Sequence, residues 1–166
     1  MASIEVDEGG LRFFNTLSGR LHIRLSEPTQ AISERLLNQM APPSARIEEV
    51  SLTLQVREQG EGREEDDAFD LDDLPAPRAL TEEEWSRVVL RTPSIRMRGE
   101  NDEEVVEHRA PDGVAFTVRD LAAAVAETER RTRGGSEWFG GIDVHHVYFE
   151  GIELEEDGVW FICWGS

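Results

Sequence analysis

The stretch that decides the fold is Glu153-Leu154-Glu155-Glu156-Asp157-Gly158-Val159-Trp160-Phe161-Ile162-Cys163-Trp164. Apolar residues stand on both sides of an Asp-Gly pair, which is a strong signal for a β-hairpin with a two-residue turn. We therefore predict two antiparallel strands, over 142–156 and 159–164. A two-residue turn fixes the register, and the expected pairs are Glu156 with Val159, Leu154 with Phe161 and Ile152 with Cys163.

This register divides the predicted hairpin into two faces. One face holds the pairs named above and is expected to be the core side. The other face carries two carboxylates and two tryptophans, Glu153, Glu155, Trp160 and Trp164, with Ile162 between the tryptophans. An exposed patch with two tryptophans favours aggregation, so we expect a helix to cover this face. The alternative is that the four residues bind a partner.

The covering helix is predicted directly upstream, over 117–131. Thr117 with Asp120 forms a capping box at its start, and Leu121 with Val125 lies on one stripe. Gly134-Gly135 ends the helix. The arginines near that end are expected to complement the helix dipole, and an anion-binding patch is the alternative for Arg130, Arg131 and Arg133.

The rest of the chain alternates between strand and helix periodicity. We predict an α+β fold in a single domain, 1–166, with an antiparallel sheet of about five to seven strands and about three helices. The expected helices span 28–40, 81–91 and 117–131. The expected strands, besides the hairpin, lie at 11–14, 21–25, 45–57, 94–98, 103–109 and 114–116.

The charge of the chain is strongly negative. Its 17 basic residues, all of them arginine, stand against 35 acidic residues, which gives a formal net charge of −18 over 166 residues. Such a field repels nucleic acid and anionic membranes and attracts basic proteins. We therefore expect no nucleic-acid and no membrane partner. Three explanations of the negative charge remain: a basic protein partner, solubility alone, and adaptation to high salt.

Residues 58–77 concentrate this charge in one segment, which we predict to be an acidic flexible loop. Apolar residues are spaced among the acidic residues of this segment, which is the pattern of a short docking motif for a basic, apolar groove. The alternative is a solvated linker. The candidate partner-binding residues of the loop are Asp66, Asp67, Phe69, Asp70, Leu71, Asp72, Asp73 and Leu74.

The compartment is predicted from what the sequence lacks. Its single cysteine, Cys163, allows no disulfide within the chain, and the first residues show no signal-peptide pattern. No apolar run approaches the roughly 18 residues of a membrane span. We expect a cytoplasmic protein.

One group of residues suggests metal or acid–base chemistry. Asp143 and His145 alternate along the predicted strand, so they share a face and could bind one metal ion together with His108 or Glu150. His146 is adjacent to His145 and would point to the opposite face. A hydrogen-bonded structural histidine is the more common role for either residue. We expect no cofactor and no catalytic residue.

Two short motifs in the last third of the chain resemble a known family. They are Thr117-Val118-Arg119-Asp120 at the helix start and Phe149-Glu150-Gly151-Ile152 in the first hairpin strand. Both are similar to the "TVRD" and "FxGL"-like motifs of a family of uncharacterised small α+β domains best represented in fungi. The resemblance implies a fold and brings no activity.

Taken together, these features favour a non-enzymatic protein that docks on a basic partner, of the kind an immunity protein or inhibitor would be. The rival hypothesis is a metal-binding or hydrolytic enzyme centred on Asp143, His145 and His146.

Overall fold

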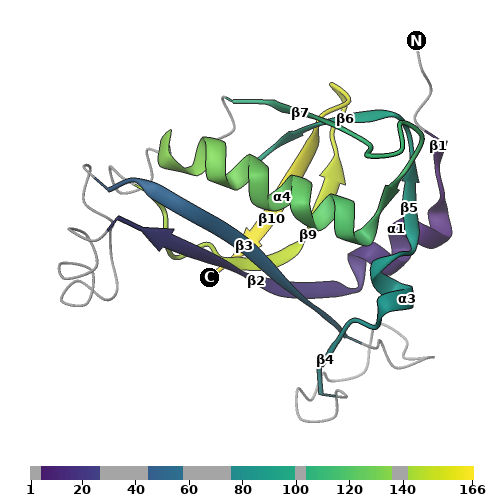
Figure 1. Cartoon of the computed structure of the whole chain (residues 1–166), viewed down its shortest axis with the longest axis horizontal. Coiled ribbons are helices and arrows are strands. Elements are labelled where there is room, and N and C mark those ends of the chain that lie inside the picture. The colour runs from purple at the N-terminus through teal and green to yellow at the C-terminus, as the bar shows by residue number, and fades with distance from the viewer. Residues whose placement is uncertain (1–4, 27–44, 58–75, 100–103, 136–141) are drawn as a thin grey trace, which may run out of the picture.

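The fold is an α+β arrangement in which one long helix lies across one face of a seven-stranded sheet (Figure 1). The computed structural model describes residues 5–26, 45–57, 76–99, 104–135 and 142–166. The strand order is β4-β3-β2-β9-β10-β6-β7. Every neighbouring pair is antiparallel except β10 and β6, which run parallel. The expected fold class is confirmed.

The strands of this sheet come from the beginning, the middle and the end of the chain. β2 and β3 form the longest pair and run side by side across the molecule. In sheet order, the bounds are Arg78–Ala79 for β4, Ile47–Val56 for β3, Leu17–Leu25 for β2, Tyr148–Leu154 for β9, Trp160–Gly165 for β10, Ser94–Arg98 for β6 and Val106–Arg109 for β7.

A second, three-stranded sheet packs beside the first. Its order is β1-β5-β8, from Glu5–Val6, Val88–Arg91 and Phe116–Thr117. Thr92 and Pro93 connect β5 directly to β6, so the chain turns a corner from one sheet into the other.

The long helix α4, Val118–Thr132, covers one side of the apolar core. Its capping box is present as predicted, with the Thr117 side chain accepting from the Asp120 backbone N–H and the Asp120 carboxylate accepting from the Thr117 backbone N–H. Leu121 and Val125 are fully buried, and one apolar cluster joins this helix to residues of both sheets. A short 3-10 turn, η2, Arg133–Gly135, follows.

The hairpin between β9 and β10 forms, but the predicted register is wrong by one position. Trp160 pairs with Leu154, Phe161 with Glu153 and Ile162 with Ile152. The loop has three residues, 156–158, because the Glu155 N–H bonds the Val159 carbonyl and Gly158 adopts a positive φ of 74°. A three-residue loop with a left-handed glycine at its third position is the next most common hairpin connection after the two-residue turn.

The shift moves the residues of β10 to the other face, while Ile152 of β9 stays on the core side as predicted. Trp160 and Ile162 point into the core and are 1% and 0% exposed, whereas Leu154 is 44% exposed at the end of its strand. Phe161 and Cys163 lie on the opposite face of the sheet, away from α4, and are half-buried; we call this face, which no described helix covers, the open face. The expectation that structure covers Trp160 and Trp164 is confirmed, because both pack in or against the core cluster beneath α4.

The segment 11–14 is not a strand. It belongs to helix α1, Glu8–Asn15, which begins at Asp7. The Asp7 carboxylate accepts hydrogen bonds from the N–H groups of Gly9 and Gly10, at 3.0 and 3.4 Å. This N-cap satisfies backbone donors that a helix start leaves open, and it outweighs the two glycines in the first turn.

The helix predicted over 81–91 is shorter than expected. α3 spans Glu82–Trp85, with the predicted capping box of Thr81 and Glu84. The chain then enters β5, because two β-branched valines and a leucine fit a strand buried between β1 and β8. The predicted strands at 21–25, 45–57, 94–98 and 103–109 are present as β2, β3, β6 and β7. The helix predicted over 28–40 and most of the acidic loop, 58–75, lie outside the described residues.

Candidate functional site

The end of α4 and the first residue of η2 bury four polar side chains. Thr128, Glu129, Thr132 and Arg133 are each 0% exposed. They occupy the helix face that Leu121 and Val125 begin, since positions four apart lie above one another on a helix. Burial of a carboxylate and a guanidinium is unfavourable unless each finds a charged or hydrogen-bonding partner.

Glu129 and Arg133 are each other's partners. Arg133 Nε lies 2.6 Å from Glu129 Oε2, and neither side chain is exposed. The other carboxylate oxygen, Oε1, accepts from the Trp164 indole N–H at 2.9 Å. The guanidinium carbon of Arg133 lies 5.1 Å from the centroid of the Trp164 ring, within cation–π range. Gly99 leaves the room that this carboxylate occupies, because a Cβ on Gly99 would collide with Glu129.

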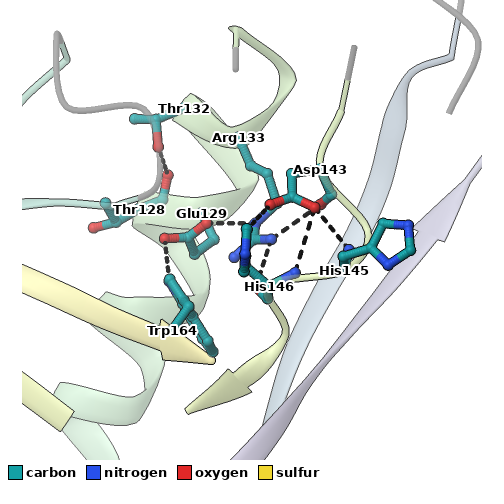
Figure 2. A network of polar contacts seen from close by, with 8 residues as sticks. All are labelled: Thr128, Glu129, Thr132, Arg133, Asp143, His145, His146 and Trp164. Carbon is teal, nitrogen blue, oxygen red and sulfur yellow. Dashed lines mark hydrogen bonds and ion pairs between the residues drawn. The ribbon is translucent and has the colours of Figure 1, made fainter. Parts of the chain in front are cut away.

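Arg133 also binds the segment that precedes β9. Its Nη1 donates to the carbonyl oxygens of Asp143 and His146, at 3.0 and 2.8 Å. One guanidinium therefore joins the end of α4, the segment 142–147 and, through Glu129, the end of β10 (Figure 2). This geometry holds three parts of the chain in place.

Asp143 organises the segment 142–147 from within. It is 2% exposed, and its carboxylate accepts from the backbone N–H groups of His145 and His146 at 2.7 and 3.3 Å. The same carboxylate lies 2.5 Å from His146 Nδ1. Because the aspartate binds these N–H groups, the segment turns, and the strand predicted from residue 142 begins only at Tyr148.

This turn changes the geometry expected for metal binding. Asp143 and His145 do not alternate on a strand face; their contact is a bond from the His145 backbone N–H to the carboxylate. Among the described residues, no group of three or more His, Cys, Asp and Glu side chains is arranged to hold a metal ion. Asp143 and His146 form a hydrogen-bonded carboxylate–imidazole pair at the edge of the buried network.

The residues assigned to the partner-binding face of the hairpin do not lie together. Trp160 is in the core and Trp164 packs against the core, while Glu153 is on the open face of the sheet, opposite Phe161. Glu155 bonds Arg98. The candidate residues between Asp66 and Leu74 lie outside the described part of the chain.

The open face does gather carboxylates at one place. Burial raises the pKa of the Cys163 thiol, and the negative charges of Glu153, Glu150 and Glu155 raise it further. The described residues offer neither Glu150 nor Glu153 an ion pair. Tyr148, on the same face of β9, is 47% exposed, and its ring lies 5.5 Å from the Arg20 guanidinium carbon.

The sequence reasoning missed the Glu129–Arg133 pair. A signal for it exists, because Glu129 continues the buried stripe four residues after Val125, and Arg133 follows at the same interval. The sequence pattern instead predicts that Arg133 complements the helix dipole together with Arg130 and Arg131, or joins them in an anion-binding patch. Those two arginines are indeed on the surface, where both bond Glu127.

Comparisons with protein-family models, with curated proteins and with solved structures found no match to this chain. The similarity of its two motifs to the fungal domain family therefore stays a prediction. Within the described part of the chain, no helix combines the length and the apolar character needed to cross a membrane.

Proposed function

We propose that this protein is a non-enzymatic interaction protein that docks on a basic partner protein, in the manner of an immunity protein or an inhibitor. Its formal charge of −18 attracts a basic protein over distances of about a Debye length, ~10 Å at 0.1 M salt. Such attraction mainly accelerates association and discriminates against acidic competitors.

The observation that carries this proposal is the group of carboxylates on the open face of the sheet. Glu150 and Glu153 are exposed, have no ion pair among the described residues, and lie close enough to Cys163 to raise the pKa of its thiol. Exposed Tyr148 lies on the same face. Arg20 already lies against the Tyr148 ring, so the groups open to an arginine or lysine of a partner are the two carboxylates, which bind such charges by ion pairs.

The test is capture of partners from lysate on the immobilised protein at about 0.1 M and about 1 M salt, where the Debye length falls from ~10 to ~3 Å. We expect a basic protein to be retained at low salt and released at high salt. The variant with Glu150→Gln and Glu153→Gln should retain less of it. The matched control, Glu48→Gln with Glu49→Gln, removes the same charge where Arg24 pairs with both carboxylates, and should retain nearly as much. Absence of any basic protein at low salt would contradict the proposal.

The rival hypothesis places metal or acid–base chemistry at Asp143, His145 and His146. Its support is the short hydrogen bond between Asp143 and His146. Elemental analysis of the purified protein and of the His145→Ala variant tests it. A stoichiometric metal that is lost in the variant would favour the rival over docking.

A further inference from the structure

The last strand of the seven-stranded sheet, β7, leaves part of its backbone unpaired. Its strand neighbour among the described residues is β6, and Ser94 lies opposite Arg109 in their antiparallel register. The Ala110 N–H bonds the Pro93 carbonyl at 2.9 Å, which continues this register. Bonded and unbonded pairs alternate along an antiparallel ladder, so the N–H and C=O groups of Glu107 and Arg109 point away from β6.

The outer edge of β7 is open to another chain. In the part of the chain that the structure describes, no strand pairs with the outward N–H and C=O groups of Glu107 and Arg109. The side chains of these two residues are 60% and 86% exposed, so they leave the edge accessible. Such a row of backbone groups is a template on which a further extended strand can pair.

The charges on this edge are complementary to a second copy of the same strand. Charged side chains on an edge usually oppose pairing, because an incoming strand seldom carries matching charges in register. When two copies of β7 pair antiparallel about a two-fold axis at His108, Glu107 of each copy lies opposite Arg109 of the other. Opposite charges directly across a strand pair are stabilising. Within one copy the two side chains lie 3.9 Å apart at exposed positions, a contact of little energetic weight.

The backbone and the charges select the same register. The two residues that become opposite, Glu107 and Arg109, are those whose N–H and C=O groups point outward, so they form two hydrogen-bonded pairs with the two His108 residues between them. The neighbouring registers that also bond outward groups place Glu107 against Glu107 or Arg109 against Arg109, and like charges directly opposite are destabilising. One register therefore satisfies both the backbone and the side chains.

We propose that two copies of this chain associate through β7, so that their seven-stranded sheets join into one continuous sheet about a two-fold axis between the two His108 residues. This axis is perpendicular to the sheet, so α4 of both copies lies on one side and the open faces of both copies lie on the other. The dimer is independent of the proposed function, and it leaves Glu150 and Glu153 exposed.

Sedimentation equilibrium of the full-length protein tests the proposal, from about 1 µM to about 1 mM protein. The salt concentration is about 0.15 M, where a Debye length of about 8 Å limits the repulsion between two chains of charge −18. Glu107→Arg creates two like-charge pairs in the dimer and should raise its dissociation constant at least about tenfold. This variant reduces the net negative charge, so a general effect of charge would tighten the association instead.

The matched control reverses both charges. Arg109→Glu alone should weaken the dimer as Glu107→Arg does. The double variant, Glu107→Arg with Arg109→Glu, keeps the net charge of the wild type and restores both opposite-charge pairs. Its dissociation constant should lie within about threefold of the wild-type value.

Amide hydrogen exchange locates the contact. The amides of Glu107 and Arg109 should gain protection as the protein concentration passes through the dissociation constant, because they enter hydrogen bonds in the dimer. The Ala110 amide already bonds the Pro93 carbonyl and is the internal control, whose protection should change little.

A protein that stays monomeric at about 1 mM would overturn the inference. A double variant that associates as weakly as the single variants would also overturn it, as would a gain of protection confined to strands other than β7. None of these outcomes bears on docking on a basic partner, which the capture experiment tests separately.

Discussion

At the scale of single residues, the stability of this protein depends most on the buried pair of Glu129 and Arg133. Arg133→Met would remove the guanidinium that bonds the buried Glu129 carboxylate, and removal of one partner from a buried pair costs about 3–5 kcal/mol. We expect that loss in the free energy of unfolding, measured by urea denaturation.

The control for this prediction is Arg130→Met. Arg130 bonds Glu127 on the same helix, but its side chain is 46% exposed, so its loss should cost far less. Replacing both Glu129 and Arg133 by methionine should recover part of the stability lost in Arg133→Met, because no uncompensated charge remains. Equal costs for Arg133→Met and Arg130→Met would refute the role given to the buried pair.

A second residue-scale prediction concerns the pH dependence of stability at His108. Burial lowers its pKa below the ordinary value of 6.5, so the unfolded chain binds this proton more readily than the folded chain. Stability then rises with pH: the contribution of neutral His108 is complete above about 6.5 and decreases as the pH falls toward the folded pKa. The stability difference between the wild type and His108→Gln should shrink from pH 7.5 to pH 5, as followed by urea denaturation. A constant difference would contradict this assignment.

Residue-level patterns predicted the capping boxes at Thr81 and Thr117, because these depend on neighbours three residues apart. They did not predict that Asp143 would bind the backbone of His145 and His146. An aspartate in a run of apolar residues is compatible with a strand face and with a turn, and the contacts of Arg133 with the same segment decide between them.

At the scale of elements, the hairpin of β9 and β10 depends on Gly158. Its φ of 74° lies in the left-handed region, where a Cβ is unfavourable, so Gly158→Ala should lower stability by about 1 kcal/mol. Gly134→Ala is the matched control. Its φ is not positive, and a Cβ there would meet nothing within 4 Å, so stability should be unchanged or slightly higher. Thermal unfolding of both variants measures the difference, and equal effects would argue against the three-residue loop.

The hairpin also shows which features of an element a local sequence pattern predicts and which it does not. Asp157-Gly158 located the turn, but the dipeptide fits a two-residue and a three-residue loop equally well. The choice shifts the register by one position and moves Trp160 from one face to the other. Burial of Trp160 and Ile162 against α4 favours the observed register, and this is a tertiary effect that a local pattern does not contain. For helix α1, the sequence signal is the N-cap residue Asp7. The apolar residues in 11–14 suggest a strand instead, and the prediction followed them.

At the scale of the whole molecule, the charge should make stability depend on salt. Repulsion among the carboxylates of a chain with a charge of −18 destabilises the compact state, and salt screens it. We expect the melting temperature to rise with salt and to level off near 0.2 M, where the Debye length is about 8 Å or less. A steep rise that continues into molar salt would instead support adaptation of the surface to a salty cytoplasm.

The charge also supplies the most direct test of docking on a basic partner. That test is the association rate constant with the captured partner, measured by stopped-flow fluorescence over a range of salt concentrations. Electrostatic attraction predicts that the association rate constant falls steeply as salt increases, while the dissociation rate constant changes little. An association rate constant that is insensitive to salt would contradict the proposal that the acidic surface recruits the partner.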